Sequence, residues 1–181
     1  MPAAKVRRLV LINGPIASGK TTIALALATR ARAAGHVAAS IDMDEMIALV
    51  AGGDWSAIHH TDRERACRVT SSLVQTLFDD GTQFAVIAGS TLAQYEWDEV
   101  TNRLEPRPEI VHVLLLVSVQ ESMRRTQDDP SRVRTKDPSF VARLAGAIDW
   151  DAVGKPDIEI DTDGMTALEV TALITQTLRL S

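Results

Sequence analysis

The sequence predicts an α/β domain built on a five-stranded parallel sheet with helices on both faces. Short apolar runs alternate with longer segments in which apolar residues recur at helical spacing, so strands and helices follow one another along the chain. Strands joined through helices lie parallel and are buried on both faces, which suits the continuous apolar character of these runs. Such sheets bind ligands at the carboxyl ends of their strands. We therefore expect the functional residues at that edge.

The first half of the chain begins this alternation at once. The apolar run Leu9–Asn13 predicts a strand, Lys20–Ala34 a helix, and Val37–Ile41 a second strand. A short helix is expected at Met43–Val50 and a longer one at Asp62–Phe78. The predicted buried face of the longer helix consists of Ala66, Val69, Leu73 and Leu77.

The second half continues the pattern. Phe84–Ala88 and Ile110–Val117 are apolar runs that predict strands, and Asp157–Ile160 predicts a shorter one. The segment Thr126–Ser139 contains Val133 as its only large apolar residue, so it is expected to be exposed, mobile or both. The predicted helices of this half are Leu92–Leu104, Gln120–Arg125, Phe140–Ile148 and Thr166–Leu178.

Composition indicates one domain over residues 1–181 and argues against several function classes. The chain is 45% hydrophobic, enough to bury a core, and its net charge is -5 with no long run of one sign. This argues against a general nucleic-acid partner, which would need a basic surface. Cys67, the only cysteine, lies in an apolar helical pattern typical of the core and allows no internal disulfide. We expect a cytoplasmic protein without a membrane partner, because no signal-peptide pattern and no apolar run of ~20 residues is found.

The segment Gly14–Thr21 matches the pattern G-x-x-x-x-G-K-[ST] between a predicted strand and a predicted helix. Glycines let successive N–H groups point at phosphate oxygens, and the helix N-terminus adds its positive dipole end. Lys20 is expected to reach the β and γ phosphates of ATP, and the Thr21 hydroxyl to ligate Mg²⁺. The alternative is a glycine turn with a chance lysine. The residues expected to bind the nucleotide are Gly14, Ala17, Ser18, Gly19, Lys20, Thr21 and Thr22.

The chain resembles the P-loop small-molecule kinases related to nucleoside monophosphate, shikimate and gluconate kinases, and the chloramphenicol phosphotransferase and zeta-toxin group. The resemblance rests on GPIASGKT at Gly14–Thr21, on Asp42-Met-Asp44, and on the arginine-bearing segment Arg124–Arg134. It implies a three-layer P-loop NTPase sandwich with the strand order 2-3-1-4-5. A GTPase is not indicated, because Asp161-Thr-Asp-Gly164 fits a switch pattern only after the last strand.

Two carboxylates follow the second predicted strand. The resemblance implies that Asp42 or Asp44 orients or deprotonates the acceptor hydroxyl, or holds Mg²⁺ through water. Phosphoryl transfer asks mainly for positioning and charge neutralisation, so an aspartate, Mg²⁺ and a few cations suffice. The alternative is a helix N-cap, because Asp42 directly precedes the helix that begins at Met43. One of the two could do each job.

Arginines flank the polar segment, where they resemble the lid of these kinases at about residues 124–140. Closing such a lid would bring guanidinium groups onto the transferring phosphate and the adenine face while excluding water. Arg124 is therefore also expected to bind the nucleotide. The alternative is a solvated loop with surface arginines. The four candidates are Arg124, Arg125, Arg132 and Arg134.

The third predicted strand departs from the family pattern at its tip. Gly89, Ser90 and Thr91 stand where P-loop proteins often carry an aspartate that holds Mg²⁺ through water. This places more of the metal binding on Thr21 and Asp42. Ser90 is expected to contact the acceptor or a magnesium-bound water, or equally to cap the following helix.

The acceptor pocket is expected between the second and third strands. Trp55 is either a stacking wall or a plug over the core, and Arg63 either binds an acceptor anion or sits on a solvated helix face. His59 and His60 are expected to be exposed, since no third metal ligand lies nearby. Residues of the next helix are expected on a solvated face, with the lining of the same pocket as the alternative; they are Tyr95, Glu96, Trp97, Asp98 and Glu99.

Together these features predict an ATP-dependent phosphotransferase that moves the γ phosphate to a hydroxyl, or a phosphate, of a small molecule with the help of Mg²⁺. One alternative is a nucleotide-binding switch or interaction protein without transfer, which the missing third-strand aspartate favours. Another is a polynucleotide 5'-hydroxyl kinase, which the net charge of -5 disfavours. The sequence selects neither the acceptor, nor ATP over GTP, nor an oligomeric state.

Overall fold

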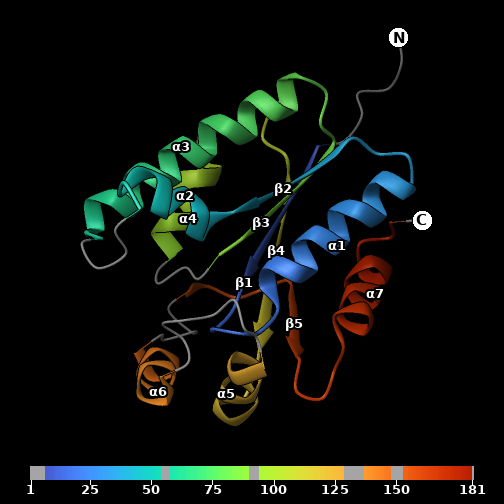
Figure 1. Cartoon of the computed structure of the whole chain (residues 1–181). Helices are drawn as coiled ribbons and strands as arrows, with labels where there is room; N and C mark the ends of the chain where they lie inside the picture. Colours follow the sequence, from blue (N-terminus) through green and yellow to red (C-terminus); the bar gives the residue numbers. More distant parts are fainter. Residues whose placement is uncertain (1–6, 54–57, 90–93, 129–136, 148–152, 181) are drawn as a thin grey trace.

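The computed structural model describes residues 7–53, 58–89, 94–128, 137–147 and 153–180, and these form one parallel sheet with helices around it (Figure 1). The five strands lie in the order β2-β3-β1-β4-β5, so the predicted fold and strand order are confirmed. The strands are β1 Arg8–Asn13, β2 Ala38–Asp42, β3 Phe84–Ala88, β4 Glu109–Leu116 and β5 Ile158–Asp161.

The register of the sheet brings the strand ends together at one edge. Central β1 pairs with β3 and β4, with Asn13 opposite Leu114, and β2 pairs with β3, with Asp42 opposite Ala88. Parallel strands in this register place the phosphate-loop segment after β1 next to the ends of β3 and β4. The site residues predicted from different parts of the sequence thus share one edge.

Helices cover both faces, which gives three layers (Figure 1). Val10 and Ile12 of β1 belong to a core with α1 and α7, while Leu9 and Leu11 belong to a second core with α2, α3 and α4. Neighbouring residues of β1 thus point to opposite faces, as strand geometry requires. The helices are α1 Lys20–Ala33, α2 Met43–Val50, α3 His60–Asp79, α4 Gln94–Thr101, α5 Val119–Asp128, α6 Pro138–Ala147 and α7 Ala167–Thr177.

The buried face of α3 differs from the prediction. Val69 and Leu73 are 43% and 38% exposed, whereas Thr70 and Ser71 are buried. The Ser71 hydroxyl donates to the Val100 carbonyl on α4 at 2.8 Å, so a polar residue is satisfied inside the helix contact. Ala66 is buried and Leu77 packs partly buried against the core, as predicted, so the apolar pattern was wrong at Val69 and Leu73.

Two further expectations are corrected. Trp97 of α4 is 1% exposed and Glu96 is 3% exposed, so this part of α4 faces the core and not solvent. Thr126 begins the segment expected to be exposed, yet it lies in α5 and is buried, with its hydroxyl donating to the Met123 carbonyl. None of the helices in the described part of the chain combines the length and apolar composition of a membrane span.

Candidate active site

The loop between β1 and α1 has a backbone that only glycine allows at its first position. Gly14 has φ +153°, and a Cβ added there would lie 2.3 Å from the Leu115 carbonyl oxygen of β4. Gly19 has φ +95° and is the N-cap of α1, a left-handed conformation that glycine adopts without steric cost. These two glycines let the loop pass close to β4 and turn directly into the helix.

Lys20 is held across this loop. Its side chain is buried, and Nζ donates to the carbonyl oxygens of Gly14 at 2.9 Å and Pro15 at 2.8 Å. Ser18 is 1% exposed, and its hydroxyl has no hydrogen-bond partner among the described residues. Because a buried hydroxyl is costly to leave unsatisfied, this atom fits a loop that completes its hydrogen bonds with a ligand.

The Thr21 hydroxyl donates to Oδ2 of Asp42 at 2.7 Å, which connects the start of α1 to the end of β2. The other oxygen, Oδ1, accepts the backbone N–H of Asp44 at 2.9 Å and caps α2. Asp42 thus caps the helix, one of the two roles considered for it, and touches the phosphate-loop threonine at the same time.

A hydroxyl and a carboxylate are ligands that suit Mg²⁺, which usually keeps several waters and takes one or two carboxylates from the protein. Thr21 and Asp42 are therefore a donor set that fits this ion together with phosphate oxygens. Within the described ranges, no group of three or more His, Cys, Asp or Glu side chains could hold a metal without such outside ligands.

Close packing at the end of β3 explains why position 89 carries a glycine and not an aspartate. A Cβ added at Gly89 would lie 2.7 Å from Cβ of Met43, so α2 packs too closely for any side chain at this position. The Gly89 N–H donates to the Ile12 carbonyl at 3.0 Å. Ser90, predicted to contact the acceptor or a bound water, lies outside the described residues, as do Thr91 and Trp55.

Arg125 of α5 reaches the phosphate loop. Its Nη1 donates to the Ala17 carbonyl and to the Thr162 hydroxyl, both at 3.1 Å, and Nη2 donates to the Thr162 carbonyl. Its Nε donates to Glu121 at 2.8 Å. Arg125 therefore ties α5 to the loop on one side and to the end of β5 on the other.

Arg124, the neighbour of Arg125 in the sequence, points elsewhere. Its guanidinium group is 62% exposed and pairs with Glu121 and Asp128 of the same helix. Hydrogen bonds from Arg124 and then Arg125 lower the pKa of Glu121 to about 2, so this carboxylate stays ionised. Of the predicted lid arginines, the structure brings Arg125 to the phosphate loop and not Arg124; Arg132 and Arg134 lie outside the described residues.

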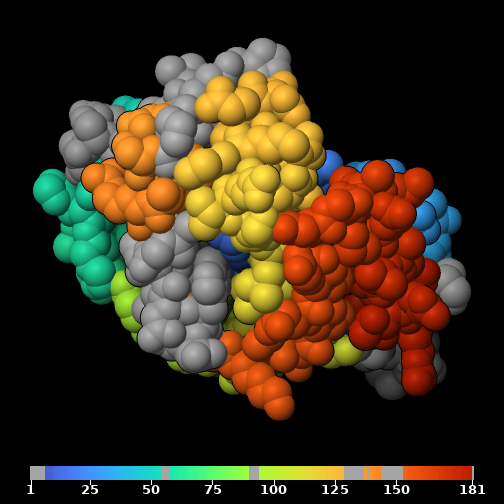
Figure 2. All heavy atoms as spheres, turned by 90° about the horizontal axis from the view of Figure 1, so that it is seen from below, coloured from blue at the N-terminus to red at the C-terminus, as the bar shows by residue number. Residues whose placement is uncertain are grey.

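A groove of about 250 Å³ opens beside the phosphate loop. Figure 2 shows α5 and the β5–α7 region next to each other on this side of the molecule, with N-terminal residues in blue visible between them. The groove is polar at the Arg125 end and apolar near α7. Its lining includes Ala17, Gly19, Thr22, Arg125, Thr162 and Met165.

On the other flank, Arg63 of α3 forms an ion pair with Glu96 of α4. Nε lies 2.6 Å from Oε1 and Nη2 lies 3.2 Å from Oε2, with the two side chains 19% and 4% exposed. Burial alone would lower the pKa of Arg63, but the hydrogen bond and charge of Glu96, with the charge of Asp44, raise it. Neither sequence alternative for Arg63, an acceptor-anion ligand or a solvated surface residue, included this pair.

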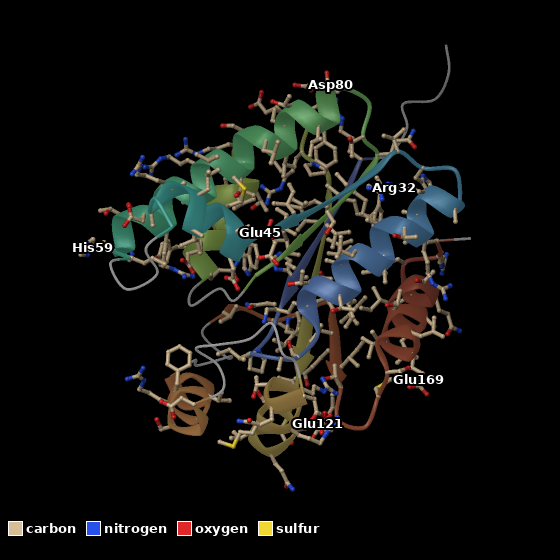
Figure 3. All side chains as sticks on the ribbon, viewed as in Figure 1. Arg32, Glu45, His59, Asp80, Glu121 and Glu169 are labelled. Carbon is tan, nitrogen blue, oxygen red and sulfur yellow. The ribbon has the colours of Figure 1, made fainter. Side chains whose placement is uncertain are left out.

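The rim of the same flank carries the two histidines. Figure 3 shows His59 at the start of α3 and Glu45 on α2, on the same side of the molecule. His60 is exposed, as predicted, and its Nε2 hydrogen-bonds to the Tyr95 hydroxyl of α4. Cys67 is buried, as predicted, and burial raises its pKa to about 11, which argues against a nucleophile.

Sequence reasoning missed three parts of this site. Thr162 carries no motif that links it to Arg125, and Glu96 had been expected on a solvated face. The Ser18 hydroxyl was expected at the nucleotide, but its burial without a partner appears only in three dimensions. The sequence offered a clue to the burial of Glu96 alone, because this residue directly precedes Trp97 and so lies at the edge of an apolar stripe.

No family model matches the sequence, and no curated protein matches it. Solved structures do match. The APS kinase of Mycobacterium tuberculosis, in complex with AMPPNP and APS, has a TM-score of 0.72 at 17% identity, with 97% of this chain and 99% of that chain covered. An unliganded sugar kinase from Janibacter sp. HTCC2649 has a TM-score of 0.69 at 17% identity, with 97% and 96% covered.

A shikimate kinase from Bacteroides thetaiotaomicron has a TM-score of 0.68 at 15% identity, with 96% of this chain and 99% of that chain covered. At such identities the similarity establishes the fold and leaves the reaction open. The order of the strands, the helices on both faces and these matches agree with the resemblance drawn from the motifs. The chain therefore has the fold of the P-loop kinases.

Proposed function

We propose that this chain is an ATP-dependent phosphotransferase that moves the γ phosphate to a hydroxyl group of a small molecule in the presence of Mg²⁺. The observation that carries the proposal is the 2.7 Å hydrogen bond between the Thr21 hydroxyl and Asp42. It places a carboxylate from the tip of β2 directly beside the phosphate loop. In that place the carboxylate would lie between a nucleotide bound on the loop and an acceptor that we propose is held by α2, α3 and α4.

The phosphate loop is the group that binds and orients ATP. Lys20 would exchange the carbonyl oxygens of Gly14 and Pro15 for oxygens of the β and γ phosphates, which it can reach by rotating its side chain. The Ser18 hydroxyl would gain a partner at the same time. Both changes require phosphate oxygens, so they would stabilise the nucleotide-bound form of the loop relative to the free form.

Thr21 and Asp42 are the residues that would hold Mg²⁺, which when bound neutralises charge on the β and γ phosphates. The Thr21 hydroxyl would then turn an oxygen lone pair to the ion and release Oδ2 of Asp42. The cap on α2 uses the other oxygen, Oδ1, and can stay in place. The structure thus allows Asp42 to change partners without loss of the helix start.

Asp42 or Asp44 is proposed to accept the proton of the acceptor hydroxyl. That hydroxyl oxygen forms a bond to the γ phosphorus, the bond from this phosphorus to the β–γ bridging oxygen breaks, and ADP leaves. Transfer of this kind depends on positioning and on compensation of charge more than on a strong base. Arg125 would support the reaction by fixing the loop at Ala17 and by lining the groove beside it, which we propose takes the base of the nucleotide.

The test is ADP release from Mg-ATP with a panel of hydroxylated metabolites, nucleoside monophosphates, antibiotics and a 5'-hydroxyl oligonucleotide, with acceptor-free hydrolysis as baseline. Lys20→Ala should lower acceptor-dependent turnover by about 100-fold or more, because a cation on the transferring phosphate is lost. Full activity of Lys20→Ala would rule out the mechanism. ATP binding without any acceptor effect would favour a nucleotide-binding switch, for which Gly89 in place of an aspartate is the supporting feature.

Asp42→Asn tests whether Asp42 takes part in the reaction or serves only as the N-cap of α2. Asparagine caps helices about as well as aspartate and can still accept a hydrogen bond from Asp44, so Tm should change little. Turnover should fall strongly if Asp42 holds Mg²⁺ or takes the proton. Asp44→Asn is the matched comparison, and the variant with the larger loss of turnover at unchanged Tm identifies the acting carboxylate.

A further inference from the structure

A buried charge pair forms part of the wall on the proposed acceptor side. Arg63 and Glu96 are joined by two nearly parallel hydrogen bonds, of 2.6 and 3.2 Å, between α3 and α4. Glu96 is 3% exposed, so almost no water can reach it to replace Arg63 as a hydrogen-bond donor. A bidentate pair of this kind holds the guanidinium group in one orientation and directs it at the carboxylate.

Asp44 links this pair to the catalytic edge. Its backbone N–H donates to Asp42, which in turn accepts from Thr21. Burial would lower the pKa of the Arg63 guanidinium, but the hydrogen bond and the charge of Glu96 raise it, and the charge of Asp44 adds a smaller effect in the same direction. The two carboxylates and one guanidinium group thus form a connected cluster of net negative charge beside Asp42.

The helices around this cluster add to the negative charge. α2 and α4 carry five acidic side chains and no lysine or arginine. On α3, Arg65 and Arg68 are exposed, and Arg65 pairs with Asp62. Among the described arginines of these three helices, Arg63 is therefore the one that is largely buried, and Glu96 already neutralises it.

We propose that the acceptor is a polyhydroxy compound that is uncharged or cationic, and that the site discriminates against carboxylates, sulfates and phosphate esters. This inference rests on the proposed phosphotransferase function and names its class of acceptor. An anionic acceptor would have to take Arg63 from Glu96, which would leave a buried carboxylate uncompensated. It would also approach Asp44, a charge of the same sign, whereas a hydroxyl or an ammonium group can donate a hydrogen bond to the Asp44 carboxylate.

One experiment compares three acceptors with the same six-carbon chain and different charges at one end: D-gluconate, D-glucitol and 1-amino-1-deoxy-D-glucitol. For the wild type, kcat/KM for the neutral and the cationic compound should exceed that for gluconate by about tenfold or more, given the strength of charge interactions near a protein surface. A preference for gluconate would overturn the inference. It would leave the phosphotransferase proposal intact, because ADP release with any acceptor supports that proposal.

A second experiment needs no acceptor at all. The wild type is saturated with Mg-AMPPNP, so that the phosphate loop is filled, and its Tm is measured with millimolar sodium sulfate and with sodium chloride of equal ionic strength. We expect no specific effect of sulfate on the wild type. Glu96→Gln should show a sulfate-dependent rise in Tm, because Arg63 then becomes available to an anion.

Glu99→Gln is the matched control, since it removes the same charge from α4 but its partner Arg103 belongs to an exposed pair. It should behave as the wild type. If Glu96→Gln does not fold, Glu96→Asp replaces it, because the shorter side chain keeps the charge and cannot maintain both hydrogen bonds. Sulfate stabilisation of the wild type that Arg63→Gln abolishes would overturn the inference. Absence of any Tm rise with Mg-AMPPNP would instead contradict the nucleotide half of the proposed function.

Discussion

Arg125 should contribute far more to the stability of the fold and of the phosphate loop than Arg124, its neighbour on α5. Arg125→Met keeps most of the apolar side-chain stem but removes the guanidinium group. Four hydrogen bonds then disappear: one to the Ala17 carbonyl, two to Thr162 and one to Glu121. Ala17 has φ +60°, an uncommon conformation for a residue with a side chain, so its position depends on such contacts.

The expected magnitude follows from these bonds. A hydrogen bond to a charged group contributes about 1.5–3 kcal/mol, and four bonds that share one guanidinium group are not additive. The Arg125 side chain is 21% exposed, so water replaces part of what is lost. We expect the free energy of unfolding to fall by about 2–4 kcal/mol. Arg124→Met loses exposed pairs within its own helix and should cause no resolvable change.

The assay is urea unfolding of both variants together with their affinity for Mg-AMPPNP. Arg125→Met should lower the urea midpoint at an unchanged m value, which indicates a loss of stability without a change in the surface exposed. Its nucleotide affinity should fall by about tenfold, since a loosened loop must be ordered on binding. Equal midpoints for Arg125→Met and Arg124→Met would refute the assignment of Arg125 as the residue that ties the loop to β5.

Two other groups make independent predictions. Burial raises the pKa of Cys67 to about 11. A thiol reagent at pH 8 should therefore label the native protein at least ~100-fold more slowly than the urea-unfolded chain. Fast labelling of the native protein would contradict the packing of α3. Burial lowers the pKa of His112 although Asp157 opposes this, so below about pH 6.5 the unfolded chain binds a proton that the native state does not. Stability should therefore decrease as the pH falls from 7 to about 5.5, and His112→Asn should remove most of this decrease; an unchanged slope in the variant would exclude His112 as its cause.

The fold could be predicted because its information is local. The three central strands β3, β1 and β4 are mainly apolar runs, and the segment Gly14–Thr21 sets the position of the first strand and helix. The order of the strands came from the resemblance and not from the apolar pattern, which carries no information on neighbours in the sheet. The observed helix ends differ from the predicted ones by a few residues. For example, α3 begins at His60, directly after its N-cap His59, whereas the prediction began at Asp62.

The interior of the helical layer was harder to predict. Ser71 is buried on α3 with its hydroxyl bonded to a carbonyl on α4, and the buried Thr70 hydroxyl donates to the Met43 sulfur on α2. A hydrophobic pattern counts such residues as surface. Glu96 presents the same difficulty with a full charge, since the ion pair with Arg63 compensates its burial. The two residues are 33 positions apart, and nothing in either sequence neighbourhood identifies the partner.

The two halves of the site therefore differ in how the sequence encodes them. The nucleotide half depends on backbone N–H groups, glycine conformations and one lysine at fixed spacing, so it must be contiguous and is visible as a motif. In the proposed function, the acceptor half would depend on pairs between helices, such as Arg63 with Glu96, and exchange of a partner would change the charge offered to the acceptor. A substitution at Glu96 should consequently alter the choice of acceptor, while Gly14–Thr21 should keep the proposed affinity for ATP. Such a separation would allow one phosphate loop to serve acceptors of opposite charge on the same fold.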